Sequence, residues 1–531
     1  MKVFQSNQNI THVTDFTQLL AFNLDNEVAR YKYVQQPLDE QYQQYIVMEQ
    51  QTIVALLIID VTKPLRVVYH GLMRNGSNKP AIFDALTTYF QSQRWDGVEY
   101  RLVSNWDEHY LLQRGFKAHG SRFTKMYQYP KYFIFGGGGA HGAFQTGAFD
   151  VLKAAGIIPD AIIGVSVGAI TGMSLMHLDS STAHEVWDYL TTQHVYGVPE
   201  IGLTREKFTR TMVNQLISRD YKSKQTLFDL FLPVATRELK NPQVKFMLVT
   251  TNAKTLTQKV VTVNENMTPK QLASWVVASS AFYPIVAPME IDGETYIDGG
   301  YSNDVPINEA IKLGAKDIYV IDIQGMGRSQ RYQVPKDVKI HWIKTKWSLG
   351  PMLDFDPVKS ETNLQLGRLE AQKFLKQVVG ARYFFETRPN FKPFDWANLA
   401  TLFMATPFTQ KFIPLLNNPM IEYLLRTKIS KFIGQKVAPN HISGHMLVEY
   451  SAFILEIVPT DVYNQQTFTK AITKAATYDQ LAEKFVLPED AWGMPYIYQH
   501  PEVILLAVIY LIGQWQKNEK ITEFKGENIS K

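Results

Sequence analysis

Cysteine is absent from this chain of 531 residues, which excludes disulfide bonds, thiolate metal sites and thiol nucleophiles. An excess of charge of one sign is also missing, because 54 lysines and arginines are balanced by 50 aspartates and glutamates, for a net charge of +4. The basic residues are scattered along the chain, so we expect no nucleic-acid partner. A weak attraction to an anionic membrane surface stays open.

Long hydrophobic runs are scarce as well. Residues 1–16 hold no continuous apolar stretch, so we do not expect a secretory signal there. The longest apolar run, residues 503–512, covers about half of the roughly 20 residues that a membrane-spanning helix needs, and we interpret it as a buried helix. We therefore expect a cytoplasmic protein and leave peripheral contact with a membrane open. The oligomeric state is not indicated.

The length of the chain predicts two or three domains, because one hydrophobic core rarely organises so many residues. Residues 1–129 alternate strand-like and helix-like patterns and predict a small α+β domain. Residues 130–345 alternate apolar strands with helices, which is typical of a three-layer α/β/α core around a mostly parallel sheet. Residues 346–531 lose the strand alternation, so we expect a mainly helical domain or cap.

Aromatic residues are frequent in the C-terminal region, where they include Phe384, Phe385, Phe391, Phe394 and Trp396. Helices rich in such residues can form an acyl-chain funnel or a membrane-facing surface. Aromatic side chains pack ordinary cores far more often, so we favour the core interpretation.

The stretch from Asn105 to Tyr127 resembles the closing segment of acetyltransferases of the GNAT superfamily, through Tyr110, Leu111, Leu112, Arg114, Gly115 and Phe116. The resemblance implies a turn with the pattern Gln/Arg-x-x-Gly-x-Gly/Ala, whose helix N-terminus binds the phosphates of coenzyme A. Residues 74–79 read Arg-Asn-Gly-Ser-Asn-Lys and break this spacing. We therefore interpret residues 1–129 as a degenerate GNAT-like domain rather than a working acetyltransferase.

A glycine-rich turn opens the central region. The apolar strand 131–135 runs into residues 136–142, which read Gly-Gly-Gly-Gly-Ala-His-Gly, and a helix is predicted over 143–155 with Gly156 at its C-cap. Glycines at such a turn let a ligand approach the main chain. The amides of Gly137, Gly138 and Gly139, at the positive end of a helix dipole, are therefore candidate donors to a developing negative charge.

A nucleophile elbow follows one strand later. The predicted strand 161–165 leads into Gly164-Val-Ser-Val-Gly168 and a further helix, which places Ser166 at the carboxyl end of the sheet. The turn is so tight that the residues at positions 164 and 168 must both be small, and both are glycine. The motif alone arises by chance on the order of 0.2 times in a chain of this length, so its context between a strand and a helix carries the prediction.

The glycine turn also satisfies the dinucleotide-binding pattern G-x-G-x-x-G over residues 137–142. A nucleotide site needs an acidic residue at the end of the following strand, where it holds the ribose. Asp160 instead precedes that strand, and Ser166 occupies the turn at its end. We therefore favour the hydrolase interpretation.

A serine hydroxyl needs a base that takes its proton. None of the 12 histidines stands in a context that marks it as a partner of Ser166, including His141, His441 and His445. Asp298, in the segment 296–306, is the better candidate. Because an aspartate is a weak base at neutral pH, it would need direct contact with the hydroxyl and a desolvated setting.

Four motifs occur in the order and at the separations typical of the patatin-like phospholipase family, which this region of roughly 200 residues resembles. They are the glycine turn, the elbow at residues 164–168, Ala278-Ser-Ser-Ala-Phe-Tyr-Pro284 with Pro288, and Asp298-Gly-Gly-Tyr-Ser-Asn-Asp-Val-Pro306. The resemblance implies a lipid ester substrate and a Ser–Asp dyad, with Ser166 as nucleophile and Asp298 as base, the latter followed by Gly299. It also implies an acyl-serine intermediate, an oxyanion turn at Gly137–Gly139, and no metal or organic cofactor.

The chain departs from the family pattern at two positions of the glycine turn. His141 stands where the family usually has arginine or lysine, so a fixed positive charge near the leaving group is in doubt and the activity could depend on pH. Gly136 replaces an acidic or small polar residue, which we expect to be tolerated. Two alternatives stay open: a serine esterase that uses a histidine, and a catalytically inactive lipid-binding or regulatory protein on the same fold.

Overall fold

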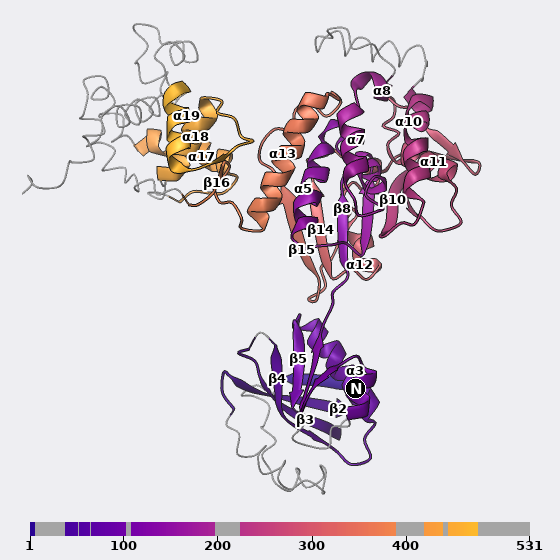
Figure 1. Cartoon of the computed structure of the whole chain (residues 1–531), viewed down its shortest axis with the longest axis vertical. Helices are drawn as coiled ribbons and strands as arrows, with labels where there is room; N and C mark the ends of the chain where they lie inside the picture. The colour runs from indigo at the N-terminus through magenta and orange to yellow at the C-terminus, as the bar shows by residue number, and fades with distance from the viewer. Residues whose placement is uncertain are drawn as a thin grey trace, which may run out of the picture. The chain divides into compact units, whose positions relative to one another are not determined.

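A computed structural model describes residues 1–5, 38–50, 52–63, 65–101, 108–196, 223–388, 419–438 and 444–475 (Figure 1). The chain divides into two compact units. One contains residues 1–131 with 308–318 and 332–340, and the other contains residues 132–307, 319–331 and 341–531. The expected boundaries at residues 129 and 345 stay predictions.

The first unit contains a seven-stranded sheet in the order β1-β2-β3-β4-β5-β7-β6. Its strands are β1 (Lys2–Gln5), β2 (Tyr42–Glu49), β3 (Thr52–Asp60), β4 (Arg66–Met73), β5 (Gly97–Arg101), β6 (Lys117–His119) and β7 (Arg122–Met126). Helix α3 (Lys79–Ser92) connects β4 to β5, the one parallel pair in this sheet, and α4 (Glu108–Gln113) precedes β6. Strands and helices thus both occur in this unit, as the pattern of residues 1–129 predicts.

The N-terminus of α3 carries its own cap. The side chain of Asn78 accepts a hydrogen bond from the amide of Ala81 at 3.1 Å, and Pro80 has no amide hydrogen to offer. Few amides are therefore left at the helix end where a phosphate would bind, in keeping with the broken spacing of residues 74–79. The GNAT-like character of this unit stays a prediction.

The second unit is built around an eight-stranded sheet in the order β12-β13-β10-β9-β8-β14-β15, with β11 also paired to β10. Its strands are β8 (Lys131–Phe135), β9 (Ala161–Val165), β10 (Lys245–Asn252), β11 (Gln258–Thr262), β12 (Met289–Ile291), β13 (Glu294–Asp298), β14 (Asp317–Asp322) and β15 (Lys339–Lys344). Strands β8, β9 and β10 run parallel, whereas β13 runs antiparallel to β10. The strands predicted at residues 131–135 and 161–165 are confirmed.

Helices cover this sheet: α5 (Ala143–Ala154), α6 (Val167–Met173), α7 (Ser181–Tyr189), α8 (Thr192–Tyr196), α10 (Ser223–Glu238), α11 (Pro269–Ser279), α12 (Ile307–Lys312) and α13 (Pro357–Phe374). All five residues of β9 are buried, because apolar side chains on both faces of a strand need cover on both sides. Helices α5 and α13 lie side by side (Figure 1). A Cβ atom at Gly147 would lie 1.9 Å from the carbonyl oxygen of Leu364, so these backbones touch.

The C-terminal region contains α17 (Pro419–Ile433), α18 (Gly444–Ile454) and α19 (Gln465–Ala475), together with two short strands. Strand β16 (Phe384–Phe385) pairs in parallel with β17 (Val462–Tyr463), so these two aromatics lie in a strand and not in the expected helix. The carboxylate of the buried Glu449 accepts hydrogen bonds from the amides of residues 381–383, which sets the path of the chain into β16.

Phe384 and Phe385 are fully buried, as the core interpretation expects. Phe391, Phe394, Trp396 and the apolar run 503–512 lie outside the described residues. Among the residues that are described, no helix is both long and apolar enough to cross a bilayer.

Candidate active site

Ser166 occupies a sharp turn between the end of β9 and the start of α6. Its backbone has φ of 53° and ψ of −125°, a conformation that costs energy for any residue with a Cβ atom. Such strain is typical of a nucleophile elbow, which lifts the serine side chain away from its own strand. The elbow predicted at this position is therefore present in the backbone.

Gly164 and Gly168 flank the serine where main-chain segments come into contact. A Cβ atom at Gly168 would lie 2.0 Å from the carbonyl oxygen of Phe135, and one at Gly164 would lie 2.3 Å from that of Gly168. Both distances are far below a van der Waals contact. The elbow therefore requires glycine at both positions, for the steric reason that the sequence analysis anticipated.

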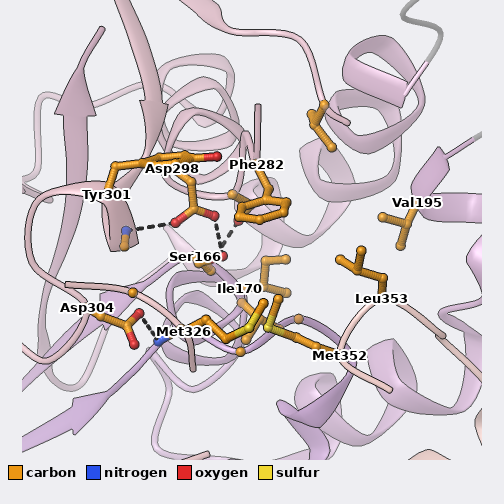
Figure 2. Close-up of a pocket in the computed structure, with 18 of the residues that line it drawn as sticks. Ser166, Ile170, Val195, Phe282, Asp298, Tyr301, Asp304, Met326, Met352 and Leu353 are labelled. Atoms are coloured by element: carbon orange, nitrogen blue, oxygen red, sulfur yellow. Dashed lines mark hydrogen bonds between the residues drawn. The ribbon is translucent and has the colours of Figure 1, made fainter. Parts of the chain in front are cut away.

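The structure brings Ser166 and Asp298 together. The serine Oγ donates a hydrogen bond of 2.5 Å to Oδ2 of Asp298, although the two residues are 132 positions apart (Figure 2). Asp298 ends β13, which pairs with β10, and β10 in turn pairs with β9. The ends of two strands in one sheet thus place the carboxylate beside the hydroxyl.

Asp298 is 4% exposed, and its burial raises the pKa of the carboxyl group to about 7. The hydrogen bonds from the Ser166 hydroxyl and the Gly300 amide lower the pKa, and the charge of Asp304 raises it further. Oδ1 accepts the Gly300 bond at 2.8 Å, so each carboxylate oxygen has one donor. A carboxylate with a pKa near the working pH suits general base catalysis far better than an ordinary aspartate does.

Two serines of the 278–284 motif hold the elbow in its conformation. The Oγ of Ser279 accepts a hydrogen bond from the amide of Ser166 at 2.9 Å and donates one to the carbonyl oxygen of Val249 at 2.6 Å. The hydroxyl of Ser280 donates to the carbonyl oxygen of Ser166 at 3.1 Å. The role of this motif depends on contacts between segments far apart in the sequence, which only the fold reveals.

The glycine turn lies beside the serine, but its amides have different surroundings. The amide of Gly137 donates to Oδ1 of Asp304 at 3.0 Å, and that of Ala140 donates to the carbonyl oxygen of Met352 at 2.7 Å. No hydrogen bond is found from the amides of Gly138 and Gly139 to any described residue. Of the three expected oxyanion donors, Gly137 therefore already has an acceptor, and Gly138 and Gly139 remain as candidates.

Asp304 is a second buried carboxyl group, 5% exposed, that the sequence analysis did not single out. Burial raises its pKa to about 6, against the lowering effect of the Gly137 amide, and Asp322 raises it further. The amide of Gly327 also donates to this carboxylate. Asp304 thereby ties the glycine turn to the loop around Gly327.

His141 is buried and does not reach the cavity. Its Nδ1 lies 3.1 Å from the carbonyl oxygen of Ile323, and its Nε2 lies 2.9 Å from that of Gly350. The imidazole therefore links two loops and does not stand beside the leaving group. Gly299 has a packing role too, because a Cβ atom there would lie 2.1 Å from the carbonyl oxygen of Val249.

Ser166 and Asp298 line a cavity of about 370 Å³. Figure 2 shows Ile170, Leu353 and Val195 on one side of Ser166. Asp298, Asp304 and Tyr301 lie on the other side. The lining also includes the apolar residues Leu190, Leu227, Val286 and Phe355. The cavity is thus apolar at one end and polar at the other.

No histidine is among the described residues that line this cavity. His445, half-buried in α18, has a pKa lowered by burial, and His441 lies outside the described residues. Within the described part of the chain, Asp298 is the titratable residue that accepts a hydrogen bond from the Ser166 hydroxyl.

A model of the patatin-like phospholipase family matches residues 133–311. Among curated proteins, the chain is 24% identical over 280 residues to patatin-like phospholipase domain-containing protein 6 of Mus musculus, covering 51% of this chain and 19% of that protein. It is 24% identical over 192 residues to lysophospholipase NTE1 of Scheffersomyces stipitis, covering 36% of this chain and 11% of that protein. The match thus spans less than one fifth of either relative.

Among solved structures, VipD from Legionella pneumophila is similar at 12% identity and a TM-score of 0.29, with 75% of this chain and 94% of that chain covered. The family match contains the glycine turn, the elbow and Asp298, and it confirms the α/β fold class expected for this region. Residues 133–311 of this chain therefore form a patatin-like phospholipase domain.

Proposed function

We propose that the chain is a serine lipid acyl hydrolase of the phospholipase or lysophospholipase type, with Ser166 as nucleophile and Asp298 as base. The observation that carries this proposal is the 2.5 Å hydrogen bond from the Ser166 hydroxyl to Asp298 at the wall of a largely apolar cavity. Hydrolysis of lipid esters needs this combination, because the acyl chain requires an apolar site and the ester carbon requires an activated oxygen.

In the first half of the reaction, Ser166 Oγ attacks the ester carbonyl carbon while its proton moves to Oδ2 of Asp298. The carbonyl oxygen becomes an oxyanion, and the amides of Gly138 and Gly139 are the donors we assign to it. Collapse of this intermediate breaks the carbon–oxygen bond of the ester. The leaving alkoxide takes the proton from Asp298, and the acyl group stays on the serine.

In the second half, a water molecule attacks the acyl-serine and gives one proton to Asp298. The tetrahedral intermediate again places its oxyanion at the glycine turn. When it collapses, the proton returns to Ser166 Oγ and the fatty acid is released. The dyad is thereby restored, and the balance is one water consumed for each ester cleaved.

The substrate class follows from the shape and polarity of the cavity. Ile170, Val195 and Leu353 offer an acyl chain an apolar surface next to the nucleophile. The relative from Scheffersomyces stipitis is named a lysophospholipase, which supports a lysophospholipid among the substrates. We propose a cytoplasmic protein that reaches its lipid through peripheral contact with a membrane surface.

The test is hydrolysis of a panel of lysophospholipids, phospholipids and glycerides by the purified chain, together with labelling by a fluorophosphonate. We expect turnover and labelling for the native protein. The variant S166A should show neither, and D298N should lose at least about a thousandfold in kcat.

Ser174→Ala is the matched control, because Ser174 is a buried serine at the other end of α6 whose hydroxyl donates to the carbonyl oxygen of Ile170. It should keep both turnover and labelling. Equal turnover by the native protein and S166A would refute the assignment. A folded native protein that binds lipid without turnover or labelling would instead identify the catalytically inactive alternative.

A further inference from the structure

The polar end of the cavity contains one cation. Among the described lining residues, Asp298, Asp304 and Arg328 carry charge, and Arg328 alone is positive. The two carboxyl groups are almost fully buried, whereas Arg328 is exposed. The lining of the cavity therefore combines two buried carboxyl groups with one exposed arginine.

The backbone of Arg328 is held at both of its polar atoms. Its amide donates to the carbonyl oxygen of Gly300 at 2.8 Å, and its carbonyl oxygen accepts from the amide of Asp304 at 2.6 Å. Gly300 comes two residues after Asp298, so the same segment anchors the catalytic carboxylate and the arginine. This anchoring fixes the origin of the long side chain relative to the dyad.

The guanidinium group has no ion pair or hydrogen bond with any described side chain or main-chain atom. A guanidinium group binds phosphate through two parallel hydrogen bonds, and it loses less hydration than an ammonium group when it does so.

We propose that Arg328 binds the phosphate of a glycerophospholipid or lysophospholipid while the acyl ester of the same molecule lies at Ser166. This inference rests on the proposed function and adds the residue that recognises the head group. In such lipids a short glycerol unit separates the ester from the phosphate. The acyl chain then occupies the side of Ile170, Val195 and Leu353, and the head group occupies the side of Arg328.

The test compares lysophosphatidylcholine with a monoacylglycerol of the same acyl chain, which has the ester but no phosphate. The variants are R328Q and R328K of the full chain, and the readout is the ratio of the two kcat/KM values. R328Q should lower this ratio about 10- to 100-fold, because a hydrogen-bonded charge pair is lost only with the phosphate substrate. R328K should retain part of the preference, since its ammonium group keeps the charge but not the two-pronged geometry.

Arg331→Gln is the matched control, because Arg331 is an exposed arginine three residues along that does not line the cavity. The ratio of the two kcat/KM values for R331Q should equal that of the native protein. Inorganic phosphate, added as an inhibitor, shows whether Arg328 binds the phosphate of a lipid head group or a free phosphate ion. If it inhibits monoacylglycerol turnover through Arg328 while lysophosphatidylcholine turnover does not depend on this residue, the site binds free phosphate and the proposal is wrong.

If R328Q lowered kcat/KM equally for both substrates, the proposal would be overturned, because this result would indicate a structural role for Arg328. An unchanged ratio would overturn it as well. A native protein that cleaves the monoacylglycerol but not lysophosphatidylcholine would refute the phosphate site and leave the hydrolase intact. Absence of both turnover and fluorophosphonate labelling would instead refute the proposed function itself.

Discussion

The amide of Gly137 donates a hydrogen bond to Oδ1 of Asp304, 3.0 Å away, across a separation of 167 positions in the chain (Figure 2). The pair lies next to Ser166, since a Cβ atom at Gly137 would be 3.3 Å from the Cβ of that serine. Asp304 therefore holds the first amide of the glycine turn, and the next two are the donors that we propose for the oxyanion. Its function, in this interpretation, is to position the donors rather than to contact the reacting atoms.

Removing the Asp304 carboxylate should therefore impair the chemical step. In D304A the amides of Gly137 and Gly327 lose their acceptor, and we expect kcat to fall about 10- to 100-fold as the oxyanion donors lose their alignment. D304N keeps an oxygen acceptor and should retain most of kcat. Because the charge of Asp304 raises the pKa of Asp298, the acidic limb of the D304N pH profile should move to lower pH. Unchanged kcat in D304A would contradict a positioning role.

The activity should rise with pH through the pKa of Asp298. Burial raises that pKa to about 7, so the carboxyl group is protonated below this pH and cannot take the serine proton. We expect kcat/KM for a lipid ester to increase about tenfold per pH unit in the acidic range and to level off above about pH 7. A profile that stays flat down to pH 5 would show that Asp298 keeps an ordinary pKa or is not the base.

The same burial should make Asp298 a source of instability at neutral pH. Its pKa of about 7 in the folded state lies above the ordinary value of 3.8 for an aspartate, so the folded state favours the proton, and stability falls as pH rises from about 4 to about 7. The side chain at position 298 carries no charge in D298N, so this variant avoids the loss of folding stability. We expect a higher Tm for D298N than for the native protein at pH 8, with a difference that shrinks toward pH 4. Thermal unfolding of both proteins across this range is the measurement, and a lower Tm for D298N at pH 8 would speak against it.

The hydroxyl of Ser279 should matter for catalysis although it does not touch the substrate. In S279A the amide of Ser166 loses its acceptor and the carbonyl oxygen of Val249 loses a donor, at a cost of about 1–3 kcal/mol. The strained elbow should then relax, and kcat should fall about tenfold with a smaller change in KM. S174A removes a comparable buried hydroxyl away from the elbow and serves as control. Equal effects of the two substitutions on kcat would indicate a general loss of stability instead.

The motifs of the site could be predicted from the sequence because each is a local arrangement. A strand, a tight turn and a helix follow one another within a few residues at Ser166, and sterics allow only glycine beside such a serine. Asp298 is less distinctive, since Asp-Gly is usually a simple turn, and the resemblance to a family adds specificity that the dipeptide lacks. The strand assigned to Phe384 and Phe385 was missed because its partner, Val462–Tyr463, lies far along the chain.

The contacts that give the site its chemistry could not be predicted from local patterns. His141 stands where the family usually has a basic residue, and the structure places its ring between two carbonyl oxygens, with the residue absent from the described lining of the cavity. Asp304, Ser279 and Arg328 carried no signal of their own, because aspartate, serine and arginine are common and solvent-exposed in most proteins. Their importance arises from neighbours that are distant in sequence.

By itself, the sequence determined which residues are able to do chemistry: a serine on a strand-to-helix turn, glycines that open the main chain, and no thiol at all. The tertiary structure alone decided which carboxylate meets the serine and which amides of the glycine turn have no acceptor among the described residues. The physical reason is that pairing of β9, β10 and β13 sets distances between segments that are far apart in the chain. Burial in that sheet then raises the pKa of Asp298 from that of an ordinary acid to that of a base suited to neutral pH.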